Sequence, residues 1–216
     1  MCGRYTITAT GEQLIERFDA ELEADFEPRY NAAPTQNLPV ILSDAPHKIR
    51  LVRWGLLPKW VREQKRDGII NVRTETLAEK PTFKKDLRER RCLVISDGFY
   101  EWQQTDKGKV PYRFTLKDGK PFVFAGIWEP HHINDQEVNT FAIITTTPNS
   151  IVEKVHNRMP VILRTETERE WLNPDLEPEQ ALGLLAPYPA SQMQAYPVST
   201  LVNLPRNDSV EVIKPA

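Results

Sequence analysis

The sequence predicts an α+β fold, with strands in the middle of the chain and helices towards its ends. Runs of branched and aromatic residues separated by short polar turns recur between residues 92 and 146, which is typical of strands. Helical periodicity lies mainly before and after them. The 18 prolines against 9 glycines indicate short elements and rigid loops, which suit a sheet-rich protein better than a helix bundle.

The first third of the chain predicts one helix, two strands and a long loop. Thr10 can cap a helix over residues 11–20, in which Leu14, Ile15 and Phe18 share one face. Extended segments are expected at 38–42 and 48–54. Residues 57–71 contain proline, glycine and six charges, and are predicted to form a long loop that carries Trp60. Loops of this length inside a compact domain are often functional.

The rest of the chain predicts a basic helix, a series of strands and then mixed elements. Pro81 suits the first turn of a helix that runs to about Arg90. Turns such as Asp118-Gly119 predict hairpins and an antiparallel sheet. Ser150 is expected to cap a short helix that ends near Val155. The predicted strands are 92–96, 99–103, 111–116, 121–128, 139–146, 159–163 and 193–198; the last two predicted helices are 166–172 and 177–185.

Length and composition favour one globular domain over residues 1–216, with its core at about 2–200 and a short proline-containing tail. The 40% hydrophobic and 27% charged residues exclude a disordered chain. No apolar run approaches a membrane span of about 20 residues, and MCGRYTIT lacks the features of a secretory signal. A cytoplasmic monomer with Cys2 and Cys92 as thiols is therefore expected. The four histidines show no zinc-ligand spacing, so we expect no metal and no cofactor.

Charge is distributed unevenly along the chain. Residues 48–91 hold fourteen Lys and Arg against six Asp and Glu, a net charge of +8, whereas the remainder carries −10. The basic segment could bind phosphate, which would indicate a nucleic-acid partner. It could equally be a solvated face whose charge is neutralised by the acidic segments around it.

The N-terminal Met-Cys-Gly is the most informative tripeptide. Removal of Met1 would leave Cys2 with a free α-amine beside its thiol, and such an amine has a reference pKa of about 7.7–8.0. The amine can attack an aldehyde to give a Schiff base, and the thiol can then close a five-membered thiazolidine ring. Alternatively, the thiol can attack an amide with the amine as base. Cys2 could also be a small buried residue without chemistry.

Three further polar positions could support such chemistry. Asn71 stands where an extended segment follows the loop after Ile69-Ile70. Glu101 lies in an aromatic stretch, and if it faces inward, loss of water would raise its pKa and suit it to proton transfer. His156 is expected at the end of a short helix, which favours imidazolium, and Arg158 could hold a phosphate. Each of these is also compatible with a structural role.

Six motifs in order give these residues a common context. They are Cys2-Gly3-Arg4-Tyr5, Arg29-Tyr30-Asn31-Ala32-Ala33-Pro34, Trp54-Gly55-Leu56-Leu57-Pro58, Asn71-Val72-Arg73-Thr74-Glu75-Thr76, Gly98-Phe99-Tyr100-Glu101-Trp102 and His156-Asn157-Arg158-Met159-Pro160. Together they resemble the SOS response-associated peptidase (SRAP) family from residue 2 to about residue 200. The resemblance implies one α+β domain with a barrel-like, mainly antiparallel β core, peripheral helices and a basic DNA groove. It also implies a DNA-repair role, with Cys2 joined as a thiazolidine to abasic sites in single-stranded DNA.

The resemblance also implies roles for individual residues. Asn71 would position Cys2, Glu101 would shuttle protons, and His156 would assist opening of the sugar ring. Residues expected to contact DNA or to line the site are Arg4, Asn31, Pro34, Trp60, Arg73, Thr145 and Arg158. Two positions depart from the family pattern: Val61 replaces a second aromatic residue after Trp60, and Asn157 replaces a common aspartate.

The same residues leave three activities open. A Schiff base at the sugar permits β-elimination, so an abasic-site lyase activity is a possible side reaction. The family name implies a thiol-dependent peptidase, which here would remove Met1. A non-covalent reader of single-stranded or modified DNA is the third alternative.

Overall fold

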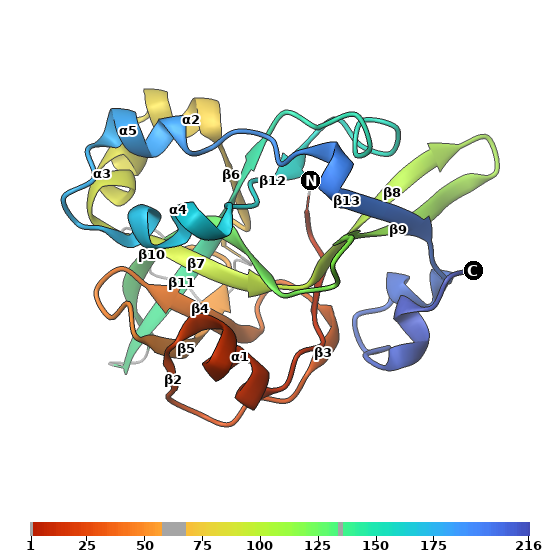
Figure 1. Cartoon of the computed structure of the whole chain (residues 1–216), viewed down its shortest axis with the longest axis horizontal. Helices are drawn as coiled ribbons and strands as arrows, with labels where there is room; N and C mark the ends of the chain where they lie inside the picture. Colours follow the sequence, from red (N-terminus) through yellow and green to blue (C-terminus); the bar gives the residue numbers. More distant parts are fainter. Residues whose placement is uncertain (1, 58–67, 134–135) are drawn as a thin grey trace.

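The computed structural model describes residues 2–57, 68–133 and 136–216, and its α+β architecture confirms the predicted fold class (Figure 1). Strands make up most of the middle of the chain, and the α-helices lie before and after this region in the sequence. The strands are β1 (Tyr5–Ile7), β2 (Glu21–Leu22), β3 (Arg29–Ala32), β4 (Asn37–Leu42), β5 (Lys48–Trp54), β6 (Asn71–Arg73), β7 (Arg91–Ser96), β8 (Gly98–Thr105), β9 (Gly108–Leu116), β10 (Phe122–Ile133), β11 (Gln136–Thr146), β12 (Met159–Pro160) and β13 (Met193–Pro197).

Five strands close into a barrel. Antiparallel pairing joins β5 to β4, β4 to β7, β7 to β10 and β10 to β11. The ring closes where β11 pairs in parallel with β5, placing Thr140 opposite Arg53 and Phe141 opposite Trp54. This confirms the barrel-like core, since a closed ring leaves these strands without a free edge over the paired length. The short strand β6 continues the parallel contact along β11, with Asn71 opposite Ile143.

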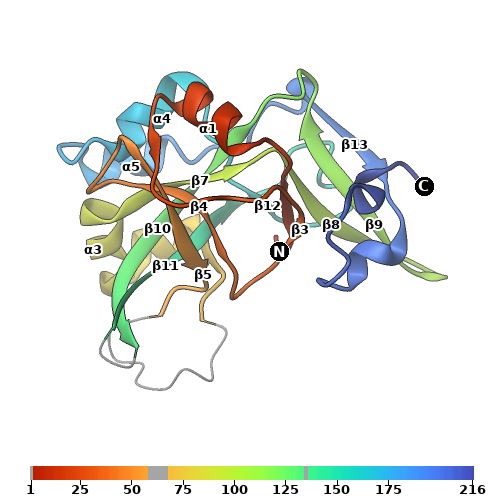
Figure 2. The ribbon, with the colours of Figure 1, turned by 90° about the horizontal axis from the view of Figure 1, so that it is seen from below.

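A second sheet of five strands packs beside the barrel, in the order β13-β9-β8-β1-β3 (Figure 2). The chain passes from the barrel into this sheet at Asp97, between β7 and β8. The Asp97 carboxylate accepts hydrogen bonds from the hydroxyls of Thr6 at 2.5 Å and Thr8 at 2.7 Å, and from the Arg113 guanidinium at 3.2 Å. This buried network fixes β1, and with it the start of the chain, against the junction of the two sheets.

Aromatic side chains fill the core between the two sheets. Trp54 is fully buried, lies 5.0 Å from the Tyr5 ring and 6.3 Å from the Phe141 ring, and donates its indole N–H to the Ile70 carbonyl at 2.9 Å. Trp54 is therefore a core residue and not part of a surface groove. Its hydrogen bond also fixes the backbone immediately before Asn71.

The helices follow most of the sequence signals. Thr10 caps α1 with a capping box that includes Gln13, and Pro81 stands in the first turn of α3, as predicted. The helix α2, directly after β6, was not predicted. Among the described residues, no helix is long and apolar enough to cross a membrane. The helices are α1 (Gly11–Phe18), α2 (Thr74–Glu79), α3 (Pro81–Glu89), α4 (Thr165–Leu172) and α5 (Pro178–Gly183).

Three local predictions were wrong. Residues 150–155 form successive turns instead of a helix, although Asn149 caps the first turn by accepting hydrogen bonds from the backbone N–H groups of Ile151 and Val152. The strand predicted at 159–163 is limited to β12. The Asp118-Gly119 turn forms, but the strands on either side of it enter different sheets, so no hairpin results.

The C-terminal tail is structured. It contains the short 3-10 helices η2 (Thr200–Asn203) and η3 (Val210–Ile213), which lie beside β3 and the second sheet. Another such turn, η1 (Ala190–Gln192), leads into β13. Sequence periodicity did not reveal these elements, since a single 3-10 turn is too short to show one.

Candidate active site

Cys2 lies at the start of the chain, just before β1, and its side chain is 1% exposed. Its thiol faces the Arg4 carbonyl, 3.8 Å from Sγ, and that carbonyl also accepts the Tyr100 N–H at 3.0 Å. Burial raises the pKa of the Cys2 thiol well above its usual range, and the nearby Glu101 carboxylate raises it further. The thiol is therefore held protonated in this state.

Asn71 holds the backbone of Cys2. Its side-chain amide donates to the Cys2 carbonyl at 2.8 Å, across 69 positions of sequence. Asn71 is placed by β6, whose pairing with β11 is reinforced by the Ile143 N–H bonded to the Ile70 carbonyl at 3.1 Å. The Asn71 oxygen finds no hydrogen-bond partner among the described residues. It is thus an acceptor available to a group on Cys2 or on a ligand.

Glu101 faces inward from β8. Side chains alternate along a strand, so Glu101 shares the face of Phe99, which packs in the main core, while Tyr100 and Trp102 face the C-terminal segment. The Glu101 side chain is 3% exposed, and burial raises the pKa of its carboxyl to about 7. The inward orientation therefore has the effect predicted for it. Near neutral pH the two protonation states are similarly populated, as a proton shuttle requires.

His156 completes the group from the turns before β12. Its Nε2 lies 3.9 Å from Glu101 Oε2, and its Nδ1 faces both the Arg158 N–H at 3.1 Å and the Arg158 carbonyl at 3.2 Å. Burial lowers the pKa of His156, so the imidazole is neutral at pH 7. The expectation that a helix end favours imidazolium was wrong, since these residues form turns.

A cavity of about 450 Å³ opens beside this pair, lined by Glu101, Trp102, Lys109, His156 and Asn203. The Trp102 indole is fixed by donating to Asn203 Oδ1 at 2.7 Å. Sequence reasoning did not select Lys109 or Asn203, because neither belongs to a recognisable motif. Trp102 was quoted within a motif without being given a role.

Three predicted phosphate-contacting residues meet along β11. Thr145 is buried in β11, opposite Arg73 of β6, and its carbonyl accepts the Arg158 guanidinium at 2.7 Å. The Arg73 side chain is exposed. Arg158 also makes two bonds to the Glu75 carboxylate, at 2.7 and 3.0 Å, which hold the pKa of Glu75 down at about 2. Glu75 was not selected from the sequence, although it lies in a quoted motif.

Arg4 and Asn31 form a separate, internal link. Asn31 is completely buried, accepts the Arg4 guanidinium at 2.9 Å, and donates to three carbonyls of the C-terminal segment. Arg4 also donates to the Val202 carbonyl at 2.8 Å, and its guanidinium carbon lies 6.0 Å from the centroid of the Trp102 ring. Pro34 is half-buried in the turn after β3, and Trp60 and Val61 lie outside the described residues. The contacts of Arg4 and Asn31 connect the start of the chain, next to Cys2, to the C-terminal segment.

Comparison with known proteins places this arrangement in a family. The family model described as SOS response associated peptidase (SRAP) matches residues 1–205. The chain belongs to the SRAP family. It is 44% identical to the abasic site processing protein YoqW of Bacillus subtilis, over 99% of each chain. It is 31% identical to the abasic site processing protein YedK of Escherichia coli, over the full length of both. A crystal structure of a protein from Bacteroides thetaiotaomicron superposes with a TM-score of 0.88, at 29% identity over both complete chains.

The basic segment of this SRAP protein is partly neutralised within the fold. Arg90 pairs with Asp86 and with Glu129, the latter at 3.0 Å, and Arg50 pairs with Glu23 at 3.0 Å. Arg91 is 1% exposed and donates to carbonyls at the ends of α3 and α4. The charge of residues 48–91 is therefore not a single phosphate-binding surface. Exposed members such as Arg73 remain candidates for contact with DNA.

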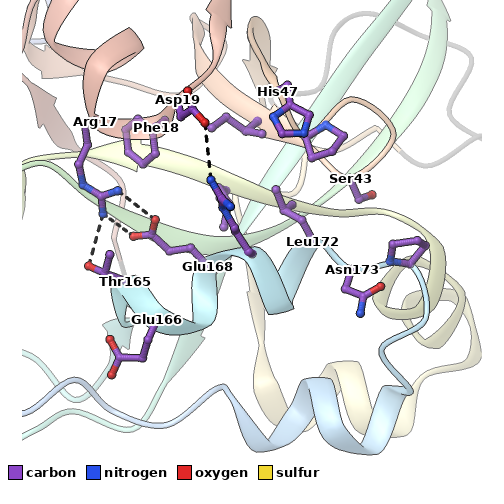
Figure 3. A pocket seen from close by; sticks show the side chains of 15 residues that line it. Arg17, Phe18, Asp19, Ser43, His47, Thr165, Glu166, Glu168, Leu172 and Asn173 are labelled. Carbon is purple, nitrogen blue, oxygen red and sulfur yellow. Dashed lines mark hydrogen bonds and ion pairs between the residues drawn. The ribbon is translucent and has the colours of Figure 1, made fainter.

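A second cavity of this SRAP protein, about 810 Å³, is separate from these residues (Figure 3). It lies between α1, α4 and the turn after β4, and its rim carries ion pairs between Arg17 and Glu168 at 2.6 Å and between Arg169 and Asp19 at 3.7 Å. It contains no residue selected for chemistry. Within the described part of the chain, no three His, Cys, Asp or Glu side chains converge as a metal site would require.

Proposed function

We propose that the mature chain, after loss of Met1, joins Cys2 covalently to abasic sites in single-stranded DNA through a thiazolidine. The observation that carries this proposal is the convergence of Cys2, Asn71, Glu101 and His156 from four distant parts of the sequence. The names of the relatives YoqW and YedK support abasic DNA as the substrate class. The product would shield the lesion from strand cleavage and from error-prone synthesis.

The reaction begins by opening the sugar. In an abasic site the C1′ hydroxyl of the hemiacetal loses its proton, the C1′–O4′ bond breaks, O4′ receives a proton, and C1′ becomes an aldehyde. Neutral His156 can take the proton from the C1′ hydroxyl and return it to O4′, which regenerates the neutral imidazole. The Cys2 amine then adds to C1′. Glu101 donates a proton to the departing hydroxyl, and one water is lost.

The thiol acts second. Burial disfavours the thiolate of Cys2, so the thiol is a poor initial nucleophile, whereas an α-amine of ordinary pKa is partly neutral. Once the iminium forms, its carbon is a strong electrophile. The sulfur bonds to C1′ while the thiol proton passes to Glu101, and the ring nitrogen becomes a neutral amine. The net reaction is loss of one water per adduct, without oxidant, reductant or cofactor.

We assign DNA binding to residues that contact the DNA backbone and lie outside the four residues of the reacting site. Arg73 at the end of β6 and Arg158 just before β12 flank Thr145, so they can contact successive phosphates without reading bases. Arg4, Asn31 and Pro34 lie on the side of the C-terminal segment, where they support or border the Cys2 strand. If the Schiff base persists, β-elimination gives lyase activity as a side reaction.

The two alternative functions, a peptidase and a non-covalent DNA reader, require different chemistry of Cys2. A peptidase needs a thiolate or an effective base at the first step, which the burial of the thiol opposes. A non-covalent reader needs neither the thiol nor the amine. The raised pKa of the thiol therefore favours condensation, in which the amine attacks first.

Intact mass spectrometry tests the proposal. The purified protein, free of Met1, is incubated with a single-stranded oligonucleotide carrying one abasic site. The expected new species has the mass of protein plus oligonucleotide minus one water, and it survives denaturation. Protein without Met1 that forms no adduct would refute the proposal. Trimming of a Met1-containing protein in the absence of any aminopeptidase would support the peptidase instead.

A further inference from the structure

The phosphate-contacting guanidinium of Arg158 already holds an anion from its own chain. Arg158 Nη1 and Nη2 donate to the two oxygens of Glu75 at 2.7 and 3.0 Å, in the two-pronged geometry that a phosphate also accepts. The carboxylate approaches from the solvent side: the Glu75 side chain is 54% exposed and that of Arg158 is 12% exposed. Glu75 is therefore the more readily displaced of the two.

The Glu75 contact leaves the hydrogen-bonding capacity of this site incomplete. Arg158 Nε and Thr145 Oγ1 are buried and find no partner among the described residues. The carboxylate occupies the two Nη atoms and leaves Nε unused. A phosphodiester with its two unesterified oxygens could take the same two positions. Arg73 on the neighbouring strand would add a second positive charge to the same backbone path.

We infer that Glu75 is an internal competitor for the DNA phosphate that binds Arg158. In the free protein Glu75 holds the guanidinium in its binding orientation, and the incoming phosphodiester must displace this carboxylate to bind. Glu75 thereby weakens affinity for any single strand. This inference rests on the proposed DNA function and adds to it a residue that controls binding strength.

The expected effect is modest and has a definite direction. An exposed ion pair contributes little, so removing the Glu75 charge should tighten DNA binding by about threefold to fivefold. Glu79 offers a matched control, since it lies on the same helix α2, is exposed, and carries the same charge. Glu79→Gln changes the net charge equally but leaves Arg158 paired, so it should alter affinity by less than about twofold.

Fluorescence anisotropy with a labelled single strand that lacks an abasic site measures non-covalent affinity directly. The proteins compared are the wild type, Glu75→Gln, Glu79→Gln, Arg158→Ala and the Glu75→Gln/Arg158→Ala double variant. Glu75→Gln should bind more tightly than Glu79→Gln, and its gain should disappear when Arg158 is absent. Thermal denaturation verifies that each variant is folded.

Equal or weaker binding by Glu75→Gln, compared with Glu79→Gln, would overturn the inference while leaving the DNA function intact. A gain that persists in the Arg158→Ala background would also overturn it, because the effect would then be one of general charge. Absence of DNA binding by wild type and all variants would refute the proposed function itself, and this inference with it.

Discussion

Replacement of Glu101 by glutamine should make the protein more stable and less active at once. The carboxyl is buried on the inner face of β8, and its pKa is raised from 4.5 to about 7. Glutamine keeps the size and polarity of the side chain but removes its charge. Because proton transfer by Glu101 is proposed for condensation, the rate of adduct formation should fall by about 10²–10⁴-fold.

The stability effect depends on pH in a defined direction. In the unfolded chain the carboxyl loses its proton near pH 4.5, whereas in the folded protein it keeps the proton up to about pH 7. The folded state therefore binds more protons across this window, and wild-type stability falls as pH rises through it. A shift of this size corresponds to at most about 3 kcal/mol. Glu101→Gln should thus exceed the wild type by only about 1 kcal/mol near pH 5 and by up to about 3 kcal/mol at pH 8.

Urea denaturation followed by tryptophan fluorescence at pH 5 and pH 8 measures this difference in the free energy of unfolding. Glu137→Gln, which replaces an exposed strand carboxylate, serves as the control and should change stability by less than about 0.5 kcal/mol at either pH. A Glu101→Gln variant whose stability relative to wild type is the same at both pH values would refute the raised pKa.

Three further outcomes are expected. Cys2→Ala keeps an N-terminal amine but loses the thiol, so denaturing gels should show loss of the stable adduct and more strand cleavage; undiminished adduct would contradict the thiazolidine. Asn31→Ala breaks its bonds to Arg4 and the C-terminal segment and should lower the free energy of unfolding by about 3 kcal/mol, as measured in urea. Raising salt from about 50 to 200 mM should weaken single-strand binding, and Arg158→Ala should reduce the log–log salt slope by about 0.7; an unchanged slope would exclude a phosphate contact.

Local signals in the sequence predicted most individual elements. The capping residue Thr10 and the first-turn Pro81 place α1 and α3 at their observed starts. The alternation and branched residues of 48–54 identify β5 with its exact observed bounds. These features depend on interactions within a few residues, which a single sequence contains.

Elements that depend on distant partners were missed or misassigned. Strand β1, which the sequence did not predict, is three residues long and pairs with β3 on one side and β8 on the other. Residues 150–155 carry helical signals but form only successive turns, and Asn149 at their start donates to the distant Tyr188 carbonyl. The closure of the barrel by β5 and β11 joins segments about 90 positions apart. No local periodicity records such pairings.

The candidate site also combines features that the sequence predicts with features that depend on distant partners in the fold. The sequence selected Asn71, Glu101 and His156 by their residue types and by the motifs in which they stand. Their convergence depends on the two-sheet fold, which brings distant segments together. The inward orientation of Glu101 follows from its position two residues after the buried Phe99. The pairing of Arg158 with Glu75 spans 83 positions and could not be derived from either motif alone.

Burial has one electrostatic consequence common to the three titratable groups of the site. It favours the neutral thiol of Cys2, the neutral acid of Glu101 and the neutral imidazole of His156. The site therefore accumulates little charge before reaction, and an iminium formed there would be costly in isolation. In the proposed condensation, proton donation by Glu101 to the departing hydroxyl would create a carboxylate at the moment that the iminium appears. The two charges arise as a pair in a site of low dielectric, so their attraction stabilises the transition state more than it stabilises the bound substrate. The burial that makes Glu101 costly to ionise is thus what makes its ionisation useful during condensation.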